Sequence, residues 1–284
     1  MHNVIHFIEH VTIDTLKLVP FLFLTYLVME ALEHKAGDKT HKVVKKAGRL
    51  GPVVGSLLGA LPQCGFSAAA SNLYAGRVVT LGTLIAIYLS TSDEMLPIMV
   101  SENVPFSTIL GILGIKVIIG MAAGLVIDVI LSGKKEEHHH IHEMCEEENC
   151  HCEKGIWMSA LIHTLHITVY ILLINIALEL LIHTIGEEVL SQMILNKPIV
   201  GPLIAGLVGM IPNCASSVII TRLYLEGALG LGAMMSGLLV NAGVGVVVLF
   251  RVNKDKKENL KILGLMYAIG VVAGIVLGFL PIQF

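Results

Sequence analysis

The stretch "LGALPQCGFSAAASNLY" at residues 58–74 interrupts an apolar run with a proline, a glutamine, a thiol and a glycine in succession. The chain around it is 55% hydrophobic and 14% charged, and its mean hydropathy is +0.79. Soluble domains carry about 25% charged residues, so this composition excludes them. We therefore predict an all-α polytopic membrane protein in which the interruption lies inside a membrane-buried segment.

The same interruption occurs again 150 residues later, in "IPNCASS" at 211–217. Residues 51–82 align without a gap with residues 201–232, and 11 of these 32 positions are identical. The apolar runs that precede the two interruptions also match, at an offset of 149. Such self-similarity predicts two copies of one unit. The expected organisation is a first membrane repeat at 1–131, a connector at 132–155 and a second membrane repeat at 156–284.

A helix needs about 20 apolar residues to cross the hydrocarbon core. Six apolar runs reach this length: 14–33, 78–100, 108–131, 156–183, 228–250 and 262–281. One of them, 78–100, contains a cluster of polar residues. Two more runs, 51–75 and 199–225, contain the interruptions. Each of their arms holds about 12 residues, or roughly 18 Å of helix, which is about half of the bilayer. We therefore expect each repeat to contain three spanning helices plus one re-entrant or broken helical hairpin.

Equivalent loops of the two copies differ in charge. The loop at 34–49 is strongly basic, whereas its counterpart at 183–197 holds one lysine; the loop at 101–107 has no basic residue, whereas that at 251–257 has four. Because cytoplasmic loops are enriched in Lys and Arg, equivalent loops are expected on opposite sides, as in inverted-topology repeats. This places the N-terminus outside and the 132–155 connector in the cytoplasm of a multi-pass protein of the inner or plasma membrane.

Non-helical backbone at membrane depth survives only where protein buries it or a watery cavity faces it, and secondary transporters build substrate sites from such broken elements. The hairpin tips "PQCG" and "PNCA" offer amide oxygens and sulfur, a donor that favours soft ions. Packing of small Cys residues is the alternative.

A second polar cluster, "LSTSDEMLP", interrupts the run 78–100. Intramembrane carboxylates usually mark an ion pathway, although this pair could also lie at the outer interface. The predicted substrate-binding or ion-binding residues are Gln63, Cys64, Ser90, Thr91, Asp93, Glu94, Asn213, Cys214 and Asn241.

The connector carries "HHHIHEMCEEENCHC" at 138–152. Its spacing does not match a closed zinc site, so we predict a flexible tract that captures thiophilic or borderline cations loosely. A merely solvated linker is the alternative. The candidate metal ligands are His138, His139, His140, His142, Cys145, Cys150, His151 and Cys152.

Other polar residues lie at helical spacing within or beside the apolar runs. Pairs of Glu and His at i, i+4, and of two His at i, i+3, could form a proton relay on one helix face, with solvated interface pairs as the alternative. The candidate relay residues are Glu30, His34, His163, His166, Glu179 and His183.

Glycines spaced four residues apart are expected to let helices approach closely. These glycines are Gly51, Gly55, Gly59, Gly270, Gly274 and Gly278. Four charged residues are expected near segment ends, where they snorkel or pair, and they are Arg77, Lys116, Arg222 and Glu226.

The motifs "GALPQCGFSAAASNLY", "LSTSDEMLP" and "IPNCASS" resemble the ten-transmembrane heavy-metal exporters, the second of two permease families named for arsenic efflux. The resemblance covers nearly the whole chain. Members of that family are also labelled manganese transporters, so it implies export of a metal or metalloid without fixing the ion. Cys64, Asp93, Glu94 and Cys214 lie inside the shared motifs.

The leading prediction is a secondary-active efflux permease for a heavy metal or metalloid, bound at midplane between the two hairpin tips. No Walker motif or catalytic constellation is present, so an ion gradient would drive transport and no enzyme is expected. One alternative is a manganese(II) exporter that uses Asp93 and Glu94, and another is a membrane metal sensor or buffer that moves nothing. We expect no cofactor beyond the transported ion and a coupling proton. We expect the lipid bilayer as a partner and no nucleic acid. The sequence leaves both a monomer and a homodimer as alternatives.

Overall fold

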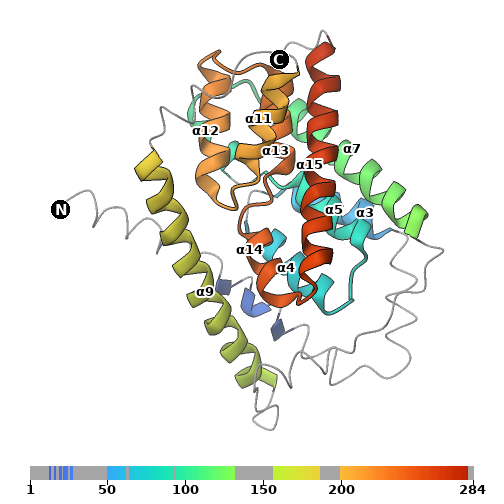
Figure 1. Ribbon diagram of the computed structural model, residues 1–284, viewed down its shortest axis with the longest axis vertical. Coiled ribbons are helices and arrows are strands. Elements are labelled where there is room, and N and C mark those ends of the chain that lie inside the picture. Colours follow the sequence, from blue (N-terminus) through green and yellow to red (C-terminus); the bar gives the residue numbers. More distant parts are fainter. Residues whose placement is uncertain are drawn as a thin grey trace.

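This computed structural model describes residues 13, 16, 19, 20, 22–24, 26, 27, 50–61, 64–92, 94–131, 156–185 and 199–280. Every regular element within these ranges is a helix (Figure 1). A first helix is represented by the described residues from 13 to 27. The others are α3 (Gly51–Gly59), α4 (Cys64–Ala75), α5 (Leu81–Ser90), α6 (Met95–Ser101), α7 (Phe106–Leu131), α9 (Ile156–Ile185), α11 (Val200–Gly209), α12 (Cys214–Leu225), α13 (Leu231–Val240), α14 (Val244–Val252) and α15 (Lys256–Phe279). The all-helical class predicted from composition is confirmed.

Four stretches of the described chain are long and apolar enough to cross a membrane. They are Leu81–Ser101, Phe106–Leu131, Leu231–Val252 and Lys256–Phe279. The first and third, which combine α5 with α6 and α13 with α14, are mostly buried, whereas most residues of α7 and α15 are partly or fully exposed. Apolar side chains on an exposed helix suit contact with lipid, because lipid tails are as apolar as the side chains themselves. The broken helices therefore form the interior and the continuous ones cover it.

Both hairpins are broken where the sequence predicts. Residues 60–63 separate α3 from α4, and residues 210–213 separate α11 from α12. Asn213 caps the start of α12, where its Oδ1 accepts a hydrogen bond from the backbone N–H of Ala215 at 3.2 Å. The arms contain 9 to 12 residues. At 1.5 Å per residue none is long enough to cross a bilayer alone.

The run 228–250, expected to be continuous, is also broken. Helix α13 ends at Val240 and α14 begins at Val244. Gly243, which separates them, has φ 54° and ψ −139°, a conformation that glycine alone adopts readily. The Oδ1 of Asn241 accepts the N–H of Gly243 at 2.8 Å and so satisfies backbone that the helix no longer pairs. The expected polar interruption of 78–100 has the same form, with α5 ending at Ser90 and α6 beginning at Met95.

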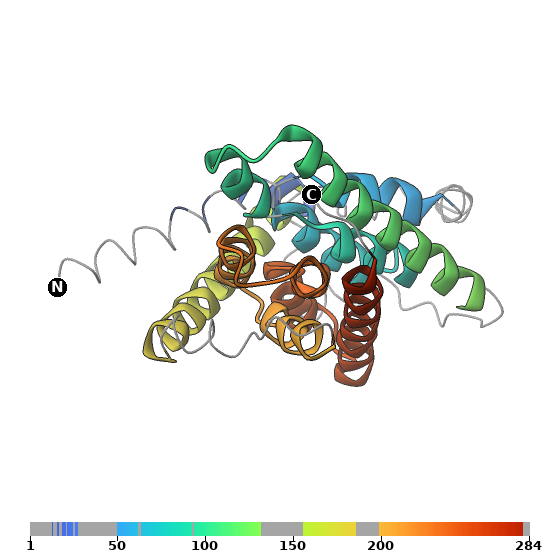
Figure 2. The same cartoon turned by 90° about the horizontal axis from the view of Figure 1, so that it is seen from above.

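The two halves of the chain contain the same series of helices. The bounds of α3 to α7 recur, shifted by about 150 residues, in α11 to α15. Within the first half α5 packs on α3 and α7, and within the second half α13 packs on α11 and α15. Seen from above, the blue-to-green helices of the first half lie on one side and the orange-to-red helices of the second half on the other (Figure 2).

Close crossings between glycines hold each half together. Gly82 of α5 and Gly124 of α7 meet so closely that a Cβ on either would clash with the carbonyl oxygen of the other. Gly232 of α13 and Gly274 of α15 form the equivalent crossing. The predicted stripes also lie against α5 and α13, which confirms their role in close packing; the stripes are Gly51, Gly55 and Gly59 on α3 and Gly270, Gly274 and Gly278 on α15.

The halves also contact each other through their broken elements. Helix α4 packs on α14, as Figure 1 shows, and α6 packs on α12. Ser71 Oγ of α4 donates to the carbonyl oxygen of Gly245 at 2.7 Å, and Tyr88 OH of α5 donates to the same oxygen at 3.1 Å. Gly245 has no side chain to hold these hydroxyls away, so its backbone joins the halves directly.

A cluster of polar side chains joins the turn after α4 to the start of α15. Glu258 accepts from both terminal nitrogens of Arg77, at 3.1 and 3.2 Å, from Tyr74 OH at 2.6 Å and from Asn253 Nδ2 at 2.8 Å. The expectation that Arg77 lies at a segment end and pairs is therefore confirmed. The contact also places the turn after the first hairpin beside the basic loop at 251–257.

Candidate functional site

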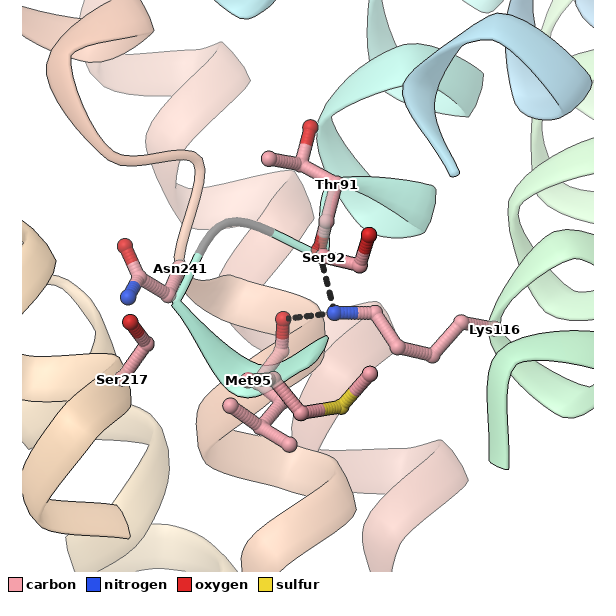
Figure 3. Close-up of a pocket in the computed structure, with 7 residues that line it drawn as sticks. Thr91, Ser92, Met95, Lys116, Ser217 and Asn241 are labelled. Atoms are coloured by element: carbon pink, nitrogen blue, oxygen red, sulfur yellow. Dashed lines mark hydrogen bonds between the residues drawn. The ribbon is translucent and has the colours of Figure 1, made fainter. Parts of the chain in front are cut away.

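The two helix breaks line one pocket in the interior of the molecule (Figure 3). The lining residues are Thr91, Ser92 and Met95 from the first break, Lys116 from α7, Ser217 from α12, and Leu238 and Asn241 from the second break. None of the seven exposes more than 3% of its surface. The pocket is thus polar, shared between the two halves, and buried within the molecule.

The first break is stabilised by hydroxyl groups. Ser90 Oγ donates to the carbonyl oxygen of Ala86 at 2.8 Å, and Thr91 Oγ1 donates to that of Ile87 at 2.8 Å, so both bond to the last turn of α5. Ser92 Oγ donates instead to the carbonyl oxygen of Ala60 at 2.7 Å. Because Ala60 follows α3, this bond ties the first break to the tip of the first hairpin.

The second break is stabilised by an amide. Asn241 Nδ2 donates to Ser216 Oγ at 3.1 Å, and Ser216 Oγ donates to the carbonyl oxygen of Asn213 at 2.8 Å. Asn213 lies at the tip of the second hairpin. Each break is therefore hydrogen-bonded to the hairpin of its own half, and movement of a hairpin would move the corresponding side of the pocket.

Lys116 is the only charged side chain among the seven lining residues that the structure describes, and the expectation that it lies near a segment end and snorkels is wrong. It is the eleventh residue of the 26-residue helix α7 and exposes only 1% of its surface. Its Nζ donates to the carbonyl oxygen of Leu238 at 2.8 Å and to that of Thr91 (Figure 3). A sequence signal for this position did exist, because Lys116 precedes Gly120 and Gly124 at intervals of four, on the face of α7 that turns inward.

The structure brings some of the predicted binding residues together. Thr91 and Asn241 line the pocket, Ser90 is buried at the end of α5 beside the first break, and Asn213 is buried at the tip of the second hairpin. Glu94 lies at the partly buried N-terminus of α6, where its side chain makes no capping hydrogen bond. Gln63, Asp93 and the side chains of Cys64 and Cys214 lie outside what the structure describes, although α4 and α12 each begin at the cysteine.

The remaining candidates lie elsewhere or are not described. The tract at 138–152, Glu30 and His34 lie outside the described residues, as do the side chains of three residues of α9: His163, Glu179 and His183. His166 is described, and it lies on an exposed face of α9 and does not line the pocket. Within the described part of the chain, no three His, Cys, Asp or Glu residues come close enough to hold a metal ion.

The pocket combines several kinds of ligand. Hydroxyl, amide and carbonyl oxygens are hard donors, the thioether of Met95 is a soft one, and the Lys116 head adds hydrogen-bond donors. Polar side chains buried inside apolar helices are costly and mark a functional site by default. The side chains pack so closely that no space for a water molecule is left between them, so a small polar or ionic solute could enter only if the two halves moved apart.

A comparison with known protein families identifies the family of this chain. A sequence family described as "Putative, 10TM heavy-metal exporter" matches residues 6–162 and 129–250, which together cover well over half of the chain. No curated protein and no solved structure matches the chain. Together with the long apolar helices, the match identifies a multi-pass membrane protein. The chain therefore belongs to this family.

Proposed function

We propose that this protein is a secondary-active efflux permease for a heavy metal or metalloid, and that the buried pocket between the two helix breaks is its substrate site. The observation that carries the proposal is the near-complete burial of seven lining residues, five of which contribute polar side chains. A pore would leave such residues open to water, whereas a carrier must close its site to both sides once in each transport cycle. The description of the family supports the same direction of transport.

The repeated architecture supports alternating access by two inverted halves, bounded at 1–131 and 156–284. In inverted repeats the loop at 76–80 and the loop at 253–255 lie on one side, because equivalent positions exchange sides. The Arg77–Glu258 ion pair joins the first of these loops to the first turn of α15, directly after the second loop. The basic loop at 251–257 then faces the cytoplasm, and the 132–155 connector with its His/Cys tract lies on the same side, where it can capture the ion before export.

Direct measurement of flux tests the proposal. Everted membrane vesicles that contain the full chain should accumulate arsenite, methylarsenite, zinc, copper, cadmium or manganese when energised, and lose the uptake when the proton gradient collapses. Ser217→Ala together with Asn241→Ala should lower uptake at subsaturating metal by about tenfold or more, because each removed hydrogen bond to substrate contributes about 1 kcal/mol. Metal binding without flux would instead identify a sensor or buffer.

A matched variant controls for effects on folding. Ser56 of α3 is as buried as Ser217, and its Oγ donates only to the carbonyl oxygen of Val53, at 2.9 Å, away from the pocket. Ser56→Ala should keep the uptake of the wild type. Equal losses of uptake in Ser56→Ala and in the Ser217→Ala/Asn241→Ala double variant would contradict the assignment of the site.

A manganese(II) exporter is a second candidate, favoured by the excess of oxygen donors in the described lining. The Cys64→Ser/Cys214→Ser double variant distinguishes a soft metal or metalloid substrate from manganese(II). Loss of arsenite or cadmium uptake in this variant would support soft coordination at the hairpin tips. Uptake of manganese that survives loss of both thiols but not Asp93→Asn with Glu94→Gln would support the second candidate.

A further inference from the structure

Lys116 joins the C-terminal ends of two broken helices that belong to different halves. Thr91 is the C-terminal cap of α5, and Leu238 lies in the last turn of α13. Carbonyl groups in the last turn of a helix have no intrahelical partner, and the helix dipole makes that end negative. The Nζ of Lys116 donates to one such carbonyl oxygen from each helix (Figure 3).

Carbonyl oxygens at the C-terminal ends of half-helices are what secondary transporters use to hold a monovalent coupling cation. A lysine ammonium carries the same single positive charge. We propose that the Lys116 head is a built-in monovalent cation, which occupies the position between α5 and α13 where a dissolved sodium ion would otherwise bind. The two broken helices then keep their charge balance without sodium, and the wild-type site does not bind it.

The corresponding position in the second half agrees with a single shared cation. Shifting by 150 residues leads from Lys116 to Met266 of α15, which is fully buried and uncharged. Two ammonium groups close together in a low-dielectric interior would repel each other strongly. One lysine therefore serves both helix ends, and it does so across the boundary between the halves.

The inference deepens the proposed function. Only one consequence rests on that function, namely that export is not coupled to sodium through this position. A purely structural role for Lys116 is the competing explanation. Both explanations predict that loss of the side chain destabilises the protein, because buried carbonyl oxygens lose their donor. Only a built-in cation predicts that a dissolved cation takes the place of the missing one.

Thermal unfolding of the purified full chain in detergent distinguishes them. Lys116→Ala should leave room between the carbonyl oxygens, and its Tm should rise by about 3 °C or more when choline chloride is replaced by sodium chloride at equal ionic strength. The rise should saturate with sodium concentration. Lys116→Met fills the same space with an apolar chain and should gain no such response. Met266→Ala, the matched control at the equivalent position, should also show none.

The wild-type protein provides a test that does not depend on any variant. Its Tm should be the same in sodium and choline chloride, and ²²Na⁺ should not bind to it. Specific stabilisation of the wild type by sodium would overturn the inference, as would a Lys116→Ala variant with the same Tm in both salts. Because neither readout involves transport, absence of metal flux combined with sodium rescue of Lys116→Ala would reject the proposed function and keep this inference.

Discussion

At the scale of single residues, the site depends on a few positions whose chemistry differs from that of their neighbours. Asn241 bonds with its amide to both Ser216 and the backbone of Gly243. It thus replaces the hydrogen bonds that α13 loses where it ends. Thr91, its counterpart in the first half, returns its hydroxyl to its own helix and leaves its carbonyl oxygen to Lys116. The two breaks are equivalent in position but are stabilised by different chemistry.

Replacing Gly243 by alanine should weaken the second break. The residue has φ 54° and ψ −139°, where an L side chain is strained by about 1–3 kcal/mol. We expect Gly243→Ala to lower the free energy of unfolding by that amount and to reduce metal uptake in vesicles. Thermal unfolding in detergent measures the first effect. Gly264→Ala, at a helical glycine with open space around it, is the control, and equal stability of the two variants would contradict the strained backbone.

At the scale of helices, the glycine crossings allow broken and continuous helices to pack at backbone distance. Gly124→Ala should push α7 away from the α5 carbonyl it touches, and Gly274→Ala should do the same to α15 and α13. Overpacking of this kind costs about 1–3 kcal/mol. Gly114→Ala and Gly264→Ala lie on the same two helices, and an added Cβ there meets nothing. These two should be neutral or stabilising by up to about 1 kcal/mol, because alanine favours helix. Thermal unfolding of all four variants compares the two kinds of position. Equal stability of the crossing variants and the control variants would show that the crossings are loosely packed.

The Arg77–Glu258 ion pair links α15 to the turn after α4, and its contribution is measurable. Both side chains are about a quarter exposed, which leaves the pair partly screened by water. A double-mutant cycle with Arg77→Met and Glu258→Gln should give a coupling free energy of about 1 kcal/mol in low salt, and less in 1 M salt. Chemical unfolding in detergent supplies the four free energies. A coupling near zero in low salt would show that the two loops are held together by other contacts.

Sequence periodicity predicts the helices and the hairpin breaks, because prolines and polar residues stand out in apolar runs. It does not predict that 228–250 is broken, since Asn241 and Gly243 are too small a polar interruption to be recognised without the alignment of the two copies. The role of Lys116 is missed for another reason. A hydropathy pattern treats a lone lysine in an apolar helix as a cost, whereas its partners are carbonyl oxygens of α5 and α13 that only tertiary structure brings near.

At the scale of the whole molecule, burial of the pocket follows from the contacts between the two halves. Helix α4 packs on α14 and α6 packs on α12, and Figure 1 shows α12 towards the upper end of the molecule and α4 and α14 below it. Each of these pairs joins a hairpin arm of one half to a broken helix of the other. If the halves rock against each other, one pair must separate while the other stays closed, which opens the pocket to one side at a time.

Labelling of introduced cysteines tests the inverted arrangement that this motion requires. Asn103 in the turn before α7 and Lys254 in the turn before α15 are exposed and occupy nearly equivalent positions in the two halves. In a chain whose five cysteines are replaced by serine, an impermeant maleimide should label Asn103→Cys in intact cells and Lys254→Cys only after permeabilisation. The physical reason is the four basic residues at 251–257, which stay in the cytoplasm. The opposite pattern would reverse the orientation, and with it the side on which the His/Cys tract collects metal. Labelling of both positions from the same side would leave the halves parallel, so that equivalent motions in the two halves would not open the pocket to alternate sides.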